Sequence, residues 1–290
     1  MSLQVSLAPP VPALHGAWAP TRFVIDSHGL HGMRNDPALR IVDLRPAAHG
    51  EEGYIPGSVH LEYDRLIRRC GPVEGLMPDP GEVAELLSSL GLEPWHRIVA
   101  YDDETGVEAA RFLWTLAVIG HDNYALLDGG FSAWQQADYP VTEQADIPEI
   151  STYPVVRFND AVADKAYVLE ALGRQGVSLV DTRNESEYSG EEVRARRGGR
   201  IPGAVHFNWM SAIDLFGSGE LLPREGLLDR LAGLGVLPDQ EIIVYCQSNR
   251  RCAGCTNRRL WATARNQNGA GKIPPPGCRR PRCRQSGRQR

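Results

Sequence analysis

The sequence has no run of apolar residues long enough to cross a membrane, which takes about 18 consecutive ones. Its first residues, MSLQVSLAPPVPALHGAW, lack the basic start and the long apolar core of a secretory signal. We therefore expect a cytoplasmic protein that does not bind a membrane. In that compartment, cysteines are expected to be catalytic, metal-binding or inert.

Acidic residues are absent from the last 40 positions. Residues 251–290 hold 11 Lys and Arg and no Asp or Glu, whereas residues 1–250 hold 20 basic residues and all 36 acidic ones. Four of the six cysteines also lie in the last segment. The chain therefore changes character just after residue 250.

The two halves of the sequence repeat each other. The segment SLGLEPWHRIVAYD at 89–102 aligns without gaps to GLGVLPDQEIIVYC at 233–246, with five identities in fourteen positions. Upstream, IVDLR corresponds to LVDTR, and YIPGSVH corresponds to RIPGAVH, in the same order. A length of 290 residues is sufficient for two domains with separate cores, so we expect one domain made twice.

Each repeat alternates short apolar runs with helical patterns. The runs RIVDL, RIVAY, ALLDG, SLVDT and EIIVY are apolar on both faces, which is typical of a parallel sheet covered by helices. Between them, leucines recur at helical spacing in 83–90 and 227–234, and a glycine follows each stripe where a helix would end. The pattern predicts an α/β fold.

The domain boundaries follow from composition. The stretch 138–159 carries three prolines and no helical pattern. We place the first domain at residues 22–142, a linker at 143–159 and the second domain at 160–251, and we treat 252–290 as a tail.

A cysteine ends one of the predicted strands. In VYCQSNRR the strand stops at Cys246, and a polar loop with Arg250 and Arg251 follows. Ligands bind at the carboxyl ends of parallel strands, where backbone N–H groups and a helix start stabilise a thiolate. Nearby guanidinium groups have the same effect. We interpret Cys246 as an exposed nucleophile of low pKa; a core cysteine, the alternative, would more naturally be followed by apolar residues.

The loop is short for phosphate chemistry. Tyrosine-phosphatase-type loops place five residues between the cysteine and an arginine. Here Cys252 holds that position, and Arg250 and Arg251 both come too early. A shorter loop suits a smaller target, such as a sulfur atom.

Together these motifs resemble those of a known family. The DLR and DTR strand ends, IPGSVH, IPGAVH, YDDETGVEAARFLW, LDGGFSAW and VYCQSNRR are similar, in order over residues 22–251, to the motifs of tandem-domain rhodaneses, which are thiosulfate sulfurtransferases. Bacterial rhodaneses whose active loop begins Cys-Gln are the most similar group. The resemblance implies two rhodanese-like domains, each a parallel sheet flanked by helices, with no metal and no organic cofactor.

The family chemistry implies that the Cys246 thiolate attacks the outer sulfur of thiosulfate and releases sulfite. The resulting persulfide then passes its sulfur to an acceptor such as cyanide. Loop N–H groups and arginines would bind the persulfide and the sulfite end. The substrate-binding residues expected on this basis are Arg183, Gln247, Ser248, Asn249, Arg250 and Arg251. For Arg183 an ion pair with Glu187 or another acid is an equal alternative.

The first repeat has Asp102 where the second has Cys246. A carboxylate is a poor sulfur acceptor, and the acidic DDETG that contains Asp102 would repel thiosulfate. The resemblance likewise implies that the N-terminal domain is the non-catalytic half.

The second repeat departs from the first after Arg251. The first continues with the helical EAARFLWTLAVIG and then NYALLDGGFSAW, whereas 252–290 has nearly the right length but no helical stripe and no strand pattern. A change of reading frame near Arg251 explains this, and the second domain is then incomplete after about residue 251. The alternatives are a four-cysteine zinc site, an arginine tail that binds nucleic acid, or disorder. We expect no metal and no nucleic acid.

Three functions stay open at this point. The larger, cationic QSNRR loop favours thiosulfate as the sulfur donor. The resemblance leaves 3-mercaptopyruvate as the alternative, although those enzymes usually carry a small Gly-Ser-Gly loop. A catalytically impaired product with a disrupted C-terminus is the third. We expect a monomer that binds a small-molecule donor and a thiophilic acceptor, and the sequence leaves the physiological acceptor open.

Overall fold

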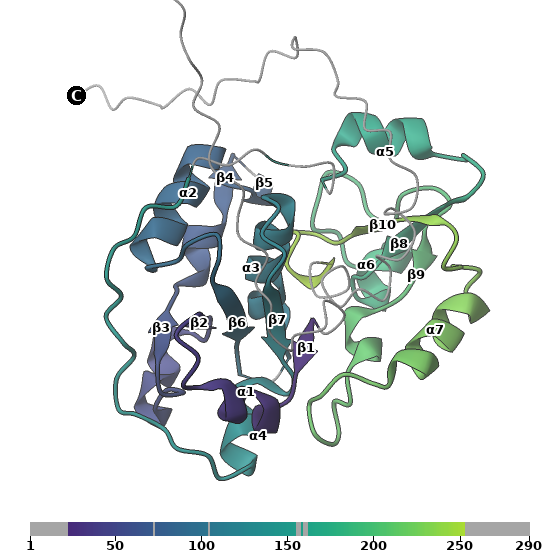
Figure 1. The fold of residues 1–290 in the computed structure, drawn as a ribbon. Coiled ribbons are helices and arrows are strands. Elements are labelled where there is room, and N and C mark those ends of the chain that lie inside the picture. Colours follow the sequence, from purple (N-terminus) through teal and green to yellow (C-terminus); the bar gives the residue numbers. More distant parts are fainter. Residues whose placement is uncertain (1–22, 72, 104, 155–157, 159–161, 253–290) are drawn as a thin grey trace, which may run out of the picture.

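The computed structural model describes residues 23–71, 73–103, 105–154, 158 and 162–252. These residues form two lobes, the first coloured purple to teal and the second green to yellow (Figure 1). The lobes correspond to the two halves of the sequence repeat, and each is built on a parallel sheet.

The first lobe contains a five-stranded sheet in the order β1-β7-β6-β2-β3, with every neighbouring pair parallel. Its strands are β1 (Val24–Ile25), β2 (Leu39–Asp43), β3 (Ser58–His60), β6 (Arg97–Tyr101) and β7 (Tyr124–Leu127). An antiparallel hairpin of β4 (Arg68–Cys70) and β5 (Val73–Leu76) stands apart from this sheet. The strand predictions for this half are therefore confirmed.

Helices cover both faces of the first sheet. They are α1 (Ser27–Met33), α2 (Pro80–Ser89), α3 (Val107–Val118) and α4 (Gly130–Gln136), with 3-10 turns at η1 (Ala47–Glu52) and η2 (Tyr63–Leu66). One core packs Val42 and Ile98 against α2 and α3, and the other packs Val99 and Leu127 against α1 and α4. Alternate residues of each strand thus face opposite cores, which explains why the strands are apolar on both faces.

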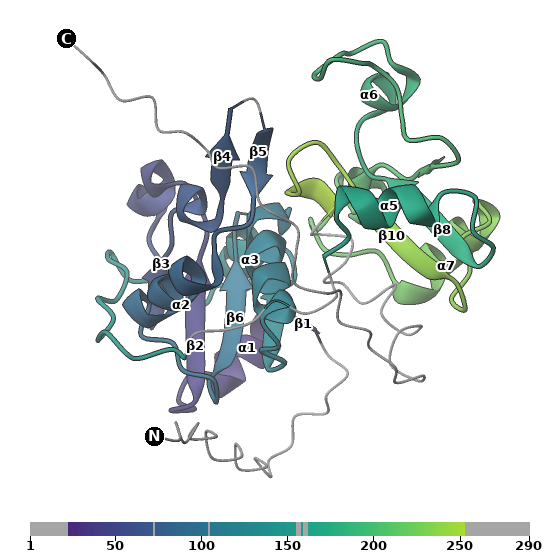
Figure 2. The ribbon, with the colours of Figure 1, turned by 90° about the horizontal axis from the view of Figure 1, so that it is seen from above.

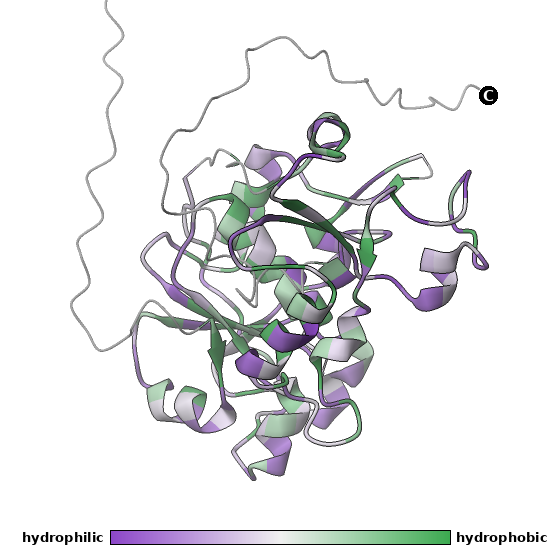
Figure 3. Ribbon diagram, turned by 90° about the vertical axis from the view of Figure 1, so that its right-hand side faces the viewer, coloured by the Kyte–Doolittle hydropathy of each residue, from purple (hydrophilic) through white to green (hydrophobic). Residues whose placement is uncertain are grey.

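The second lobe repeats this plan with a three-stranded parallel sheet in the order β10-β8-β9 among the described residues. Its elements are α5 (Lys165–Ala171), β8 (Val177–Asp181), α6 (Glu185–Ser189), β9 (Val205–His206), η3 (Trp209–Ala212), α7 (Arg224–Gly233) and β10 (Glu241–Tyr245). The glycines predicted to end α2 and α7, Gly91 and Gly235, have positive φ angles of 67° and 79°. In Figure 3 the strands are coloured mainly as hydrophobic, and much of the purple lies on helices and loops.

The second sheet is less covered than the first. All of β6 after its first residue is buried, whereas four of the five residues of β10, its counterpart, are half-buried. Residues 251 and 252 are helical, where the sequence predicted no helix, and the described chain ends there. The predictions for 253–290 — a changed reading frame, a zinc site, a nucleic-acid tail — lie outside the described residues.

The loop after β10 reaches the first lobe, beside the β4–β5 hairpin and α3 (Figure 2). A further contact lies between Leu221 and Asp128, where the backbone N–H donates to the carboxylate at 2.8 Å. Both lobes therefore contribute to the surroundings of Cys246. Among the helices that the structure describes, none has the length and apolar composition needed to span a membrane.

Candidate active site

Cys246 lies at the carboxyl end of β10. Tyr245, the last residue of this strand, pairs in register with Asp181 at the end of β8. In the first lobe Tyr101 pairs with Asp43 in the same way. The next residues, Cys246 and Asp102, therefore occupy equivalent positions at the edge where parallel sheets bind ligands.

In the first lobe that position caps a helix. The carboxylate of Asp102 accepts hydrogen bonds from the backbone N–H groups of Gly106 at 2.7 Å, Glu108 at 3.0 Å and Ala109 at 3.2 Å. These donors belong to the start of α3, whose positive end favours an anion. At Cys246 the backbone N–H groups of Ser248 and Cys252 take the place of these donors.

The thiol of Cys246 is half-buried and lies 3.6 Å from the sulfur of Cys252. A hydrogen bond from the Cys252 thiol lowers the pKa of Cys246 to about 6, against the opposing effect of burial. The backbone N–H groups of Cys252 and Ser248 and the charge of Arg251 lower this pKa further. Cys246 is therefore largely a thiolate at neutral pH, which is the reactive form of cysteine.

Arg251 connects the loop to a buried carboxylate. Its Nη1 and Nη2 atoms donate to Glu187 at 2.5 and 3.1 Å, and it is also in hydrogen-bond contact with Cys246. Burial alone would raise the pKa of Glu187, but the bond and charge of Arg251 outweigh it and keep this pKa below its usual range. Arg251 is thus fixed beside the nucleophile by a bidentate ion pair.

Arg183, predicted to bind the donor or to pair with an acid, forms an ion pair with Asp181. Its Nε and Nη2 atoms donate to that carboxylate, with Nη2 at 2.6 Å, and Nη2 also donates to the carbonyl of Gly199. Arg45 makes the same bonds to Asp43 in the first lobe. The acid is therefore Asp181, not Glu187. Because the pair recurs in the half that has Asp102 in place of Cys246, it stabilises the end of the strand in both sheets.

Two residues of α3 hold the loop from the first lobe. Arg250 forms an ion pair with Glu108, and its guanidinium carbon lies 5.0 Å from the ring centre of Tyr63. Arg111 donates from Nη1 to the backbone carbonyl of Asn249 at 3.3 Å. The first lobe therefore positions the loop of the second.

The β4–β5 hairpin approaches the loop so closely that only glycine fits. A Cβ atom on Gly75 would lie 1.8 Å from the carbonyl oxygen of Ser248. Gly75 also has a positive φ angle of 71°, a conformation that favours glycine. The hairpin backbone is thus in direct contact with the loop that carries Cys246.

A cavity of about 1320 Å³ lies between the two lobes beside this loop. Of the predicted loop residues, Gln247, Ser248, Arg250 and Arg251 line it. The structure places Asn249 elsewhere, with its side-chain oxygen 3.7 Å from the sulfur of Cys252.

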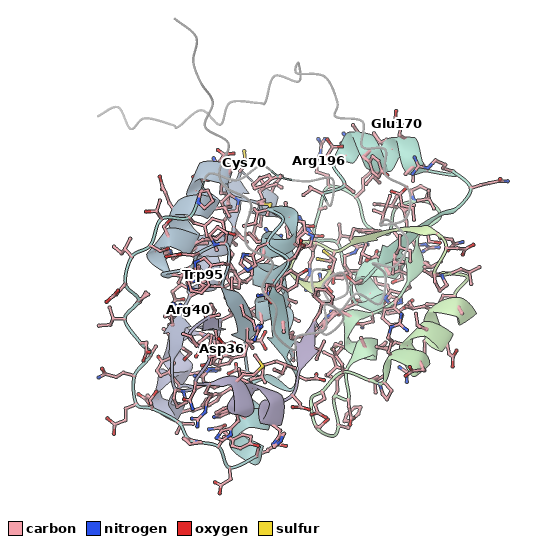
Figure 4. All side chains as sticks on the ribbon, viewed as in Figure 1. Asp36, Arg40, Cys70, Trp95, Glu170 and Arg196 are labelled. Atoms are coloured by element: carbon pink, nitrogen blue, oxygen red, sulfur yellow. The ribbon has the colours of Figure 1, made fainter. Side chains whose placement is uncertain are left out.

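The cavity walls carry opposite charge. The second lobe contributes four arginines and the first lobe four carboxylates, namely Arg194, Arg196, Arg250, Arg251, Glu74, Asp102, Asp103 and Glu108. Arg250 and Arg251 are held in ion pairs, and Arg194 pairs with Glu192. Arg196 forms no ion pair with any described residue, and Figure 4 shows it on the side of the second lobe that faces the first.

Sequence reasoning did not identify Arg194 and Arg196. The sequence feature that could have identified them is the basic run RARRGGR, which precedes the IPG turn of the second repeat and is absent before that of the first. Trp209, at the start of η3, also lines the cavity. Within the described part of the chain, His, Cys, Asp and Glu side chains do not gather into a cluster that would hold a metal ion.

Comparison with known proteins agrees with this geometry. A family model described as the rhodanese-like domain matches residues 27–137 and again 164–271. The thiosulfate sulfurtransferase of Azotobacter vinelandii is 37% identical over 228 residues, which are 79% of this chain and 83% of the relative. The thiosulfate sulfurtransferase of Pseudomonas aeruginosa is 35% identical over the same shares of both chains.

A solved structure shares the fold of the whole described chain. SseA from Escherichia coli, described as a 3-mercaptopyruvate sulfotransferase with the rhodanese fold, matches with a TM-score of 0.72 and 28% identity. The match covers 82% of this chain and 93% of that one. The chain therefore belongs to the rhodanese family, with two rhodanese domains. The second family match runs to residue 271, beyond residue 251, where composition placed the end of the domain.

Proposed function

We propose that this chain is a thiosulfate sulfurtransferase that carries sulfur on Cys246. The observation that supports this most strongly is the thiol of Cys246, whose pKa is lowered to about 6 at the carboxyl end of a parallel strand. The names of the curated relatives support a sulfurtransferase function in general.

The reaction takes two steps. In the first, the Cys246 thiolate attacks the outer sulfur of thiosulfate, the bond between the two thiosulfate sulfurs breaks, and sulfite leaves with that electron pair. Cys246 then carries a persulfide anion. In the second, a thiophilic acceptor such as cyanide attacks the outer sulfur and leaves as thiocyanate, which restores the thiolate. No metal or organic cofactor takes part.

The arginines of the site divide into two roles. Arg251 and Arg250, each in an ion pair with a glutamate, fix the loop, and Arg183 braces the strand end through Asp181. Arg196 lines the cavity and has no ion pair with a described residue, so it is available to bind the sulfonate end of the donor. Arg194 lines the cavity beside it. The backbone N–H groups of the loop bind the outer sulfur of the persulfide.

Charge on the second lobe supports thiosulfate as the donor. The arginines of the second lobe suit the dianion thiosulfate better than the monoanion 3-mercaptopyruvate, which stays the alternative because SseA is described as acting on it. The test is to follow thiocyanate formation from cyanide with each donor, for the full chain and for Cys246→Ser. We expect kcat/KM for thiosulfate to exceed that for 3-mercaptopyruvate by about tenfold. The reverse order would assign the chain to the alternative.

A second candidate is a rhodanese with impaired catalysis. It is favoured by β10, which is half-buried where its counterpart β6 is buried. In this case neither donor gives thiocyanate, while thermal unfolding shows that the first lobe remains folded. Thiocyanate production that is lost in Cys246→Ser would exclude this candidate.

A further inference from the structure

We propose that Cys252 is a resolving thiol that converts the Cys246 persulfide into a Cys246–Cys252 disulfide and releases hydrosulfide. This gives the chain a second activity, the release of sulfide from thiosulfate at the expense of thiols. The inference rests on the proposed function, because it needs the persulfide on Cys246. The two sulfur atoms, 3.6 Å apart, are the observation that carries it.

The two cysteines are placed to form a bond. A disulfide has a sulfur–sulfur distance of about 2.05 Å, so the sulfurs must approach by roughly 1.5 Å, which side-chain rotation and a small loop shift supply. The backbone N–H of Cys252 already points to the sulfur of Cys246, so the two residues are held together by the loop that connects them. Neither cysteine is in a disulfide in the structure.

The side of approach also fits. Cys252 is buried, with 7% of its surface exposed, whereas Cys246 is half-buried and is followed directly by Gln247 and Ser248, which line the cavity. The outer sulfur of a persulfide on Cys246 must face the cavity to meet cyanide. An attack from Cys252 therefore reaches the inner sulfur from the protein side, opposite the outer sulfur that leaves.

The step balances without an external oxidant. The sulfur of Cys252 bonds to the inner sulfur of the persulfide on Cys246, and the bond between the inner and outer sulfurs breaks. The outer sulfur leaves with the electron pair and takes the thiol proton of Cys252 as hydrosulfide. The sulfane sulfur is reduced, and the two cysteines are oxidised to the disulfide. Hydrosulfide leaves readily because it is a weaker base than an alkyl thiolate.

Cys252 carries the proton that the step needs. Its thiol donates to the side-chain oxygen of Asn249 at 3.7 Å, and its sulfur is in hydrogen-bond contact with the sulfur of Cys246 at 3.6 Å. Asn249 has a positive φ angle of 55°, a conformation that asparagine tolerates better than most residues. The loop backbone therefore directs an acceptor toward Cys252, whereas it directs N–H donors toward Cys246.

Further turnover needs a small dithiol, which reduces the disulfide and restores both thiols. The sum is thiosulfate plus two thiol groups, giving sulfite, hydrosulfide, a disulfide and a proton. Cyanide competes with this route because it attacks the outer sulfur of the same persulfide. Thiocyanate is therefore expected to replace sulfide as the concentration of cyanide rises.

The test is a single turnover without an acceptor. The reduced full chain, freed of reductant, is mixed with one equivalent of thiosulfate, and sulfite and sulfide are measured over time. We expect one sulfite per chain, then one sulfide per chain at a rate independent of protein concentration, and a chain mass lower by two hydrogen atoms. Trypsin cuts after Arg250 and Arg251, so the disulfide appears as two linked peptides. Fragmentation assigns it to Cys252 rather than Cys255, which shares that peptide.

The matched control is Cys252→Ser, which keeps a hydrogen-bond donor and removes the sulfur. We expect its ratio of sulfide to sulfite to fall from about one to near zero, whatever the rate of sulfite release. Sulfite without sulfide or linked peptides in the natural chain would overturn the role of Cys252 and leave the proposed function intact. Equal sulfide from Cys252→Ser would do the same. Absence of the sulfite burst would overturn the proposed function, and this inference with it.

Discussion

Arg111, in the lobe that has Asp102 at the position equivalent to Cys246, donates a hydrogen bond to the backbone carbonyl of Asn249, in the loop that follows Cys246. Its side chain is fully buried, and its Nη2 atom donates to the carbonyls of Leu66 and Gly75 at 3.5 and 3.3 Å. One guanidinium group thus connects η2, the β4–β5 hairpin and the loop that follows Cys246.

Replacement of Arg111 is expected to reduce activity in two separable ways. Arg111→Met removes both the bonds and the positive charge, so we expect kcat to fall by about a hundredfold and the apparent pKa of Cys246 to rise. Arg111→Lys keeps the charge, so kcat falls but the apparent pKa stays. The measurement is the pH profile of sulfite release for each variant. Equal pH profiles for both variants would show that the charge of Arg111 does not act on Cys246.

The close approach of Gly75 to Ser248 gives a matched pair of substitutions. Gly75→Ala places a methyl group on the loop carbonyl, and we expect kcat/KM for thiosulfate to fall by about a hundredfold. Gly71, in the same hairpin, also has a positive φ angle, but the methyl group of Gly71→Ala would meet no atom of a described residue within 4 Å. Both variants lose about 1 kcal/mol of stability from the backbone conformation. Similar activity in the two variants would show that the hairpin does not position the loop.

The pH dependence of sulfite release reports the thiolate. Because the pKa of Cys246 is lowered to about 6, the active form is present above this pH and is lost as the pH falls through it. We expect kcat/KM to be flat above pH 6 and to fall about tenfold for each unit below. Cys252→Ala removes the largest cause of the lowering, so the fall should begin at a higher pH. An unchanged pH profile in that variant would show that the backbone N–H groups, and not the Cys252 thiol, lower the pKa of Cys246.

The role of Arg196 predicts a split between binding and chemistry. Arg196→Ala removes a lining charge that has no ion pair among the described residues, so we expect KM for thiosulfate to rise about tenfold with little change in kcat. Arg197→Ala is the control, because Arg197 is exposed and does not line the cavity. A larger rise of KM in Arg197→Ala than in Arg196→Ala would show that Arg197, and not Arg196, binds the donor.

The carboxylate of Asp102 has a structural role that substitution reveals. Asp102→Ala removes the acceptor of three N–H groups at the start of α3, so we expect a loss of about 0.5–2 kcal/mol in the free energy of unfolding. The helix carries Glu108 and Arg111, so sulfur transfer at Cys246 should fall as well. Thermal unfolding and the cyanide assay measure both effects, and a stable variant of full activity would contradict them.

Much of the fold was predictable because residues close in sequence determine its strands and helices. Strands such as β6 and β10 are continuous apolar runs, α2 begins with the Asp79–Glu82 capping box, and the repeat fixed the equivalence of Cys246 and Asp102. The Asp-x-Arg motif in both halves was a sign that Arg183 pairs with Asp181, because an arginine present in a half without a nucleophile has a structural role there.

Contacts between the lobes were not predictable from the sequence. Arg111 lies on an apolar helix, and nothing near it in sequence indicates a bond to a carbonyl 138 residues away. Gly75 sits in a turn-like segment where glycine has many explanations. Arg250 and Arg251 were expected to bind the donor because charge on a loop suggests it, but their partners, Glu108 and Glu187, are brought to them only by the tertiary fold.

The most direct measurement is a rapid-quench experiment on sulfur transfer to Cys246. The reduced full chain is mixed with excess thiosulfate, quenched within the burst with an alkylating reagent and digested with trypsin. We expect one added sulfur atom on the peptide that contains Cys246, in step with one sulfite released per chain. An added sulfur on another cysteine, or sulfite release that persists in Cys246→Ser, would contradict the assignment of Cys246 as the sulfur carrier.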